Sequence, residues 1–78
     1  MSTQPRYLRE VSKRFAELRG ERTYDQFARD TGIAKALLQR YETGGGLPSL
    51  YVMYRLAARE KVSLNWLALG LGPRYIKN

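Results

Sequence analysis

The chain of 78 residues contains no cysteine and no histidine. Without these side chains it cannot form a disulfide, a metal site built from thiolates or imidazoles, or a hydrolytic triad. Its seven carboxylates lie mostly near basic residues and do not make a convincing metal-binding set. The composition therefore predicts a protein that is not an enzyme, holds no metal or cofactor, and has no small-molecule substrate.

Long hydrophobic runs are absent as well. No apolar stretch approaches the roughly 20 residues of a membrane-spanning helix, and the first residues, Met1 to Arg6, lack the apolar core of a secretory signal. We therefore expect a cytoplasmic protein without a membrane partner. A chain of this length predicts one small domain.

Negative charge is scarce relative to positive charge. Fourteen lysines and arginines against seven acidic residues give a net charge of +7 and an isoelectric point near 10.2. Such a balance favours a polyanionic partner. Charge alone does not distinguish DNA from RNA or from an anionic membrane surface, and it is also compatible with simple solubility.

The most informative segment predicts two short helices joined by a glycine turn. Thr23, with Gln26 three residues later, is the reciprocal capping signature of a helix start. Gly32 supplies the left-handed backbone of a tight turn, and a second helix follows over about 34–42. Two helices across such a turn are the helix-turn-helix layout, whose second helix can enter the major groove of DNA.

The second of these helices has two distinct faces at 100° per residue. One arc is apolar and consists of Ala34, Leu37, Leu38 and Tyr41. The opposite arc combines side chains that can read guanine or adenine with one small residue that permits close approach. This outer arc consists of Lys35, Ala36, Gln39 and Arg40. An ordinary amphipathic helix with a solvated polar face would show the same pattern.

Apolar periodicity and capping residues predict five helices and no strands. The first helix begins near Pro5 and ends at about Arg19, with one apolar face toward the core. The fourth begins after Ser49, with Leu50, Met53, Leu56 and Ala57 expected to point inward. The fifth begins at Ser63 and stops at Gly70, with Trp66 and Leu67 in the core.

Three motifs follow one another at a characteristic spacing. Glu42, Gly44, Pro48 and Ser49 give the pattern E-x-G-x-x-x-P-S, residues 62–70 read VSLNWLALG, and residues 17–23 read ELRGERT. Over Arg14 to Gly72 the chain thereby resembles the Cro/CI (XRE-type) helix-turn-helix family, and in particular the DNA-binding domain of lambdoid phage repressors. The resemblance implies an all-α, compact five-helix lambda-repressor-like fold over residues 1–72, followed by a short basic tail, 73–78.

Family membership also implies roles for individual residues. Lys35, Ala36, Gln39 and Arg40 match the positions that contact base edges. The positions that approach the sugar–phosphate backbone correspond to Thr23, Tyr24, Thr43, Gly44 and Gly45. Arg19 and Glu42 match a partly buried ion pair that holds the first helix to the recognition helix. The alternatives are flexible turn chemistry for the glycines and two exposed charges for the pair.

Four positions depart from the family pattern. Tyr24 stands where glutamine is usual, so a phosphate contact at this position would fall to the phenol. Ala34 replaces the usual Ser or Thr cap of the recognition helix, a loss of about 1 kcal/mol. Leu37 replaces a small polar residue and can be partly buried or contact DNA. Glu60 lies near the negative end of a helix dipole, so we expect a basic neighbour or an exposed location.

The resemblance implies a sequence-specific DNA-binding transcriptional regulator of a bacterial cell, associated with the nucleoid. It implies a phage or prophage-type repressor that binds double-stranded DNA, at a palindromic operator, as a homodimer. One alternative is a protein-interaction module on the same fold, antirepressor or antitoxin-like, which the apolar segment 34–38 and the weak cap favour. The other is a non-specific nucleic-acid binder, with steep salt dependence and no preference among sites.

Overall fold

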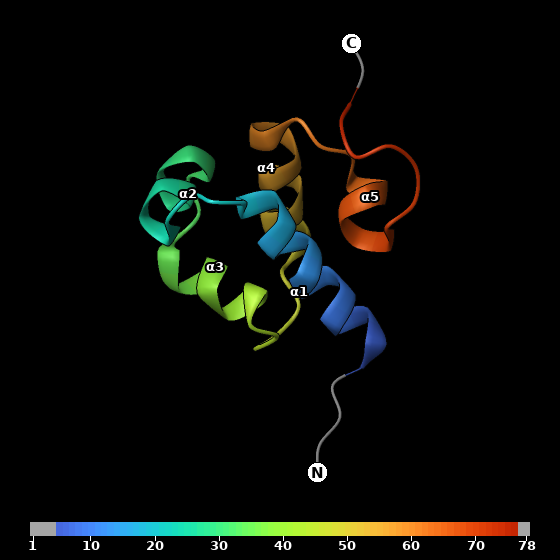
Figure 1. The fold of residues 1–78 in the computed structure, drawn as a ribbon, viewed down its shortest axis with the longest axis horizontal. Coiled ribbons are helices and arrows are strands. Elements are labelled where there is room, and N and C mark those ends of the chain that lie inside the picture. The colour runs from blue at the N-terminus through green and yellow to red at the C-terminus, as the bar shows by residue number, and fades with distance from the viewer. Residues whose placement is uncertain (1–4, 77–78) are drawn as a thin grey trace.

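The structure, a computed structural model, describes residues 5–76 and contains five helices over that range (Figure 1). They are α1 (Arg6–Arg19), α2 (Tyr24–Thr31), α3 (Lys35–Glu42), α4 (Leu50–Glu60) and α5 (Leu64–Leu69). The prediction of an all-α chain with five helices is confirmed. Predictions for residues 1–4 and 77–78 lie outside the described residues.

Side-chain caps fix the starts of three helices. Thr23 Oγ1 accepts from the Gln26 amide at 3.1 Å, while the Thr23 amide donates to Gln26 Oε1 at 3.2 Å, so the capping box of α2 is complete. The hydroxyls of Ser49 and Ser63 accept from backbone amides in the first turns of α4 and α5, without a reciprocal side-chain bond. Ala34 precedes α3 and provides no side-chain cap, so this helix depends on tertiary contacts for its stability.

The turn between α2 and α3 uses a glycine and a buried hydroxyl. Gly32 has φ 71° and ψ 20°, the left-handed conformation expected at this position. Thr31 is fully buried, and its Oγ1 donates to the Phe27 carbonyl at 2.7 Å. The same oxygen accepts from the Ile33 amide at 3.3 Å, which satisfies a backbone group inside the turn. The sequence motifs did not predict that the Thr31 hydroxyl accepts from the Ile33 amide.

One hydrophobic core joins all five helices. Helix α1 lies between the α2–α3 pair and α5, contacting α3 and α5, and α4 packs against α2 and α5 (Figure 1). Phe15 of α1 meets Tyr41 of α3 edge to face, with ring centroids 6.0 Å apart. The core residues are Val11, Phe15, Leu18, Phe27, Ile33, Leu38, Tyr41, Val52, Met53, Leu56, Ala57, Val62 and Leu67.

Leu50 is exposed, and the expectation that it points into the core is wrong. Its side chain is 77% exposed, although it shares the helical face of the buried Met53 and Ala57. Leu50 is the first residue of α4 and lies at the edge of the buried arc of the helix, about 90° from its centre at 100° per residue. Trp66, also expected in the core, is half-buried beneath the guanidinium of Arg74, which lies 4.7 Å from its ring centroid.

The segment after α5 returns to the body of the protein. The Ser63 amide donates to the Arg74 carbonyl at 2.8 Å, and the Ile76 amide donates to the Lys61 carbonyl at 3.1 Å. A single β-bridge, Val62 to Tyr75, is the only strand-like pairing among the described residues. The division into a domain of residues 1–72 and a tail of 73–78 stays a prediction.

Replacing Thr31 by valine should lower the free energy of unfolding by about 1–3 kcal/mol. The substitution conserves volume but leaves the Ile33 amide without its acceptor inside the turn. Thermal melts would measure the loss. Thr43→Val is the matched control, because this threonine is exposed and water can replace its hydroxyl. Equal melting temperatures for Thr31→Val and the unmodified protein would contradict the role assigned to the hydroxyl.

Candidate nucleic-acid interface

Helix α3 separates a buried face from an exposed one. Leu38 and Tyr41 are buried, and Leu37 is half-buried against the core. The four residues of the opposite arc are all exposed: Lys35, Ala36, Gln39 and Arg40. This outer face carries two cations, an amide and a methyl group on one short helix. Its chemistry suits hydrogen bonding to base edges.

An ion pair anchors the C-terminal end of α3 to the C-terminal end of α1. Arg19 Nη2 lies 2.7 Å from Glu42 Oε1, and Arg19 Nε lies 2.9 Å from Oε2, a bidentate arrangement. The Glu42 side chain is 8% exposed and that of Arg19 is 23% exposed. The hydrogen bonds to Glu42 raise the pKa of Arg19.

Tyr24 extends this ion pair to α2. The guanidinium of Arg19 lies over the Tyr24 ring, 4.4 Å from its centroid, and Arg19 Nη1 also donates to the Arg22 carbonyl at 2.8 Å. Burial, together with the Glu42 carboxylate, raises the pKa of the Tyr24 phenol. The tyrosine at the usual glutamine position therefore contributes to the orientation of α3.

Lys35 is only weakly held. Its Nζ lies 3.1 Å from Asp25 Oδ1, and both side chains are at least half exposed. Exposed pairs of this kind contribute about 0–1 kcal/mol. The lysine can therefore leave Asp25 for another acceptor at low cost. The contact also places the first turn of α2 beside the start of α3.

Arg40 lies folded against the loop that follows α3. Its Nε donates to the Gly45 carbonyl at 3.1 Å, and the Gly45 amide donates to the Arg40 carbonyl at 2.7 Å. Thr43 Oγ1 donates to the Gln39 carbonyl at 2.7 Å, and Gly44 is buried with φ 80°. The loop is thereby tied to the last turn of the helix.

Four other arginines bind carbonyl groups at the ends of helices. Each cation meets the last turn of a helix, where carbonyls lack partners and the helix dipole is negative. Arg14 donates to Leu67 and Ala68, Arg22 to Leu18 and Arg19, Arg55 to Thr31, and Arg74 to Glu17. These arginines stabilise the fold, so the basic composition is in part a structural requirement. No local pattern marks them, because their carbonyl partners belong mostly to other helices.

Arg22 has the most partners of this group. It forms ion pairs with Glu60 at the end of α4 and, at 3.0 Å, with Asp30 of α2, and its guanidinium lies over the Phe27 ring. The hydrogen bonds to Glu60 raise the pKa of Arg22. The expectation of a basic neighbour for Glu60 is confirmed. One guanidinium thus joins the ends of α1, α2 and α4.

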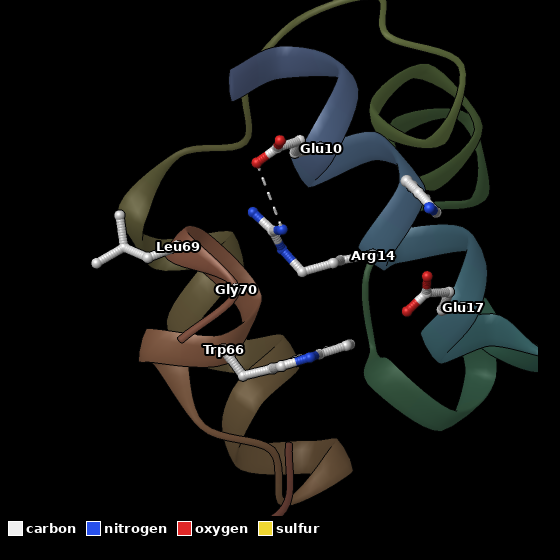
Figure 2. Close-up of a pocket in the computed structure, with 7 residues that line it drawn as sticks. Glu10, Arg14, Glu17, Trp66, Leu69 and Gly70 are labelled. Carbon is white, nitrogen blue, oxygen red and sulfur yellow. Dashed lines mark ion pairs between the residues drawn. The ribbon is translucent and has the colours of Figure 1, made fainter. Parts of the chain in front are cut away.

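A cavity of about 320 Å³ lies between α1 and α5 (Figure 2), and its lining residues come from these two helices and Gly70, not from α3. Arg14 crosses it to reach the carbonyls of α5, and its Nη1 lies 3.9 Å from Glu10 Oε2. Arg14 therefore has a structural role, because it holds α5 against α1. Among residues 5–76, no group of acidic side chains could hold a metal ion, and no helix is long and apolar enough to span a membrane.

Comparison with known proteins identifies a helix-turn-helix segment in this chain. A family model described as helix-turn-helix matches residues 15–67, more than half of the chain. The matched range begins within α1, includes α2, α3 and the turn between them, and ends within α5. No curated protein and no solved structure matches the chain.

Glu42→Ala should lower the free energy of unfolding by about 2–3 kcal/mol, less than the loss expected for a fully buried pair because Arg19 keeps some contact with water. Glu42→Gln should cost less, since the amide oxygen still accepts from the guanidinium. Thermal or urea melts would rank the variants.

The matched control for this pair is Glu21→Ala, which removes an exposed carboxylate outside the helices. It should change stability by less than about 0.5 kcal/mol. Melting of Glu42→Ala within the error of the unmodified protein would show that the pair does not hold α3.

Proposed function

The chain belongs to the Cro/CI-type helix-turn-helix family, whose members are DNA-binding regulators, and we propose that it is a repressor of the phage or prophage type. In this proposal it acts in the cytoplasm of a bacterial cell, at the nucleoid. Helix α3 is the recognition helix and enters the major groove of an operator.

The observation that carries the proposal is the outer face of α3, which is exposed while the opposite face is anchored in the core. Lys35 and Arg40 can donate to O6 and N7 of guanine, and Gln39 can pair with adenine. Ala36 is small enough to let the helix approach a thymine methyl group. Together these side chains can distinguish base pairs, which is the requirement for a specific operator.

We further propose that two segments contact the sugar–phosphate backbone. Thr23 and Tyr24 lie at the start of α2, where helix amides and the dipole favour an anion. Thr43, Gly44 and Gly45 follow α3; Thr43 and Gly45 are exposed, and the lack of a side chain at Gly45 allows close approach, whereas the buried Gly44 would contribute through the turn of the backbone. The amide and hydroxyl of Thr23 already form the capping box. In this proposal, Thr23 therefore contributes to DNA binding by fixing the position of the N-terminal end of α2.

Selection of bound sequences from random duplex DNA tests the function. A repressor of this kind should enrich one motif, arranged as two half-sites of opposite orientation. Retention of DNA without an enriched motif would instead support the non-specific binder, and failure to retain DNA would support the protein-interaction module. Two features favour the protein-interaction module. Ala34 and Ala36 are exposed, and α3 has no side-chain cap.

Arg40→Ala and Lys35→Ala should each weaken binding to the selected operator by about 1–3 kcal/mol and change which base is preferred at one position. Binding to a scrambled duplex should weaken much less. Titrations of both duplexes at one salt concentration would measure the effects. Lys13→Ala, an exposed lysine that lines the α1–α5 cavity, is the control and should affect both duplexes slightly and equally. Equal losses on both duplexes for Arg40→Ala would make this arginine a backbone contact.

The protein should be a monomer or a weak dimer in free solution and pair on the operator, with half-sites about 34 Å apart or a multiple of that distance. We place the contact at the loop Gly45 to Pro48 and adjoining surface, where Leu47 and Leu50 are exposed. So small an apolar patch does not support an obligate dimer. Sedimentation with and without operator DNA would measure assembly, and a tight dimer at nanomolar concentration without DNA would contradict it.

A further inference from the structure

The loop between α3 and α4 contains three consecutive glycines, Gly44 to Gly46, and they differ in backbone conformation. Five of the seven glycines in the chain, Gly44 among them, have φ between 62° and 80°, which other residues rarely adopt. Gly45 and Gly46 are not in this group. Backbone conformation therefore does not require glycine at either position.

The side chain of Arg40 occupies the space that a Cβ atom would need. A Cβ on Gly45 would lie 2.8 Å from Cγ of Arg40 and 3.2 Å from its carbonyl oxygen. A Cβ on Gly46 would lie 3.3 Å from both Nε and Nη2 of the same arginine. The two glycines without a positive φ are thus the two that lie against Arg40.

Hydrogen bonds hold the arginine in this position and leave one edge of it available. Arg40 Nε donates to the Gly45 carbonyl at 3.1 Å, and the Gly45 amide donates back to the Arg40 carbonyl at 2.7 Å. Within residues 5–76 the two Nη groups have no hydrogen-bond partner. A guanidinium fixed through Nε can still present Nη1 and Nη2 side by side, a geometry that matches two neighbouring acceptors.

We propose that Gly45 and Gly46 are positioning residues for DNA binding, which hold Arg40 so that its Nη1–Nη2 edge faces O6 and N7 of a guanine. This inference rests on the proposed function, in which Arg40 contacts a base. Fixing the side chain before binding reduces the rotamer freedom lost when the complex forms. The loop is then part of the recognition surface through its effect on Arg40.

The test is a double-mutant cycle between Gly46→Ala and Arg40→Ala, measured on the selected operator and on a scrambled duplex. In the unmodified background, Gly46→Ala should weaken operator binding about tenfold. This loss lies toward the lower end of the range expected for losing one bidentate contact with a base. It should affect the scrambled duplex little. In the Arg40→Ala background, and also with Arg40→Lys, which lacks the Nε donor, Gly46→Ala should have no further effect.

Stability separates this role from a structural one. Alanine at an ordinary φ restricts the unfolded chain, so Gly46→Ala should melt at or above the temperature of the unmodified protein while binding its operator more weakly. Gly72→Ala is the matched control: its φ of 75° makes alanine unfavourable, but no atom lies within 4 Å of the added Cβ. It should melt earlier and leave the operator affinity of the folded protein unchanged.

Two results would overturn the inference, and they differ in what they imply. If Gly46→Ala weakens operator binding equally with and without Arg40, the glycine does not act through the arginine, while the proposed function stands. If Arg40→Ala itself changes neither operator affinity nor base preference, both the positioning role and the assignment of Arg40 to a base are wrong.

Discussion

The orientation of α3 depends on the ion pair between Arg19 and Glu42. Helix α3 has only eight residues and lacks a side-chain cap at its start, and the ion pair at that end, between Lys35 and Asp25, is exposed. Helices this short are not stable alone in water. Leu38 and Tyr41 bury one face, but the bidentate pair sets the direction of the C-terminal end. A helix that must match the spacing of base pairs needs such a fixed direction.

The short helices impose a second constraint: many carbonyls at helix ends need hydrogen-bond donors, and arginine side chains supply several of them. The C-terminal end of every helix leaves four carbonyls without helical partners, and in a small domain helix ends form a large share of the backbone. Arg14, Arg22, Arg55 and Arg74 donate to carbonyls of this kind, and their charge opposes the negative end of the dipole. The basic composition therefore reflects the fold as well as the preference for a polyanionic ligand.

The sequence predicted the features that depend on local chemistry. Capping residues such as Thr23, Ser49 and Ser63 mark helix starts, and the 3.6-residue period separates the two faces of α3. Features that depend on distant neighbours were not predictable. Leu50 has the i, i+3, i+7 spacing of the buried Met53 and Ala57 but is exposed at the edge of the buried arc, and the partners of Arg22 come from three helices. The candidate base contacts came from helical phase and family resemblance, and the conformation of Arg40 came only from the structure.

Glycine-rich loops are usually interpreted through flexibility, and the loop after α3 shows why that interpretation is incomplete. Gly44 meets a backbone requirement, because its φ is 80°. Gly45 and Gly46 meet a steric one, because the side chain of Arg40 fills the space beside them. Ordering an arginine on binding costs about 0.5–1.5 kcal/mol. In the proposed role, a loop that already holds the arginine reduces that cost, so small residues can raise the affinity of the contact made by the long side chain next to them.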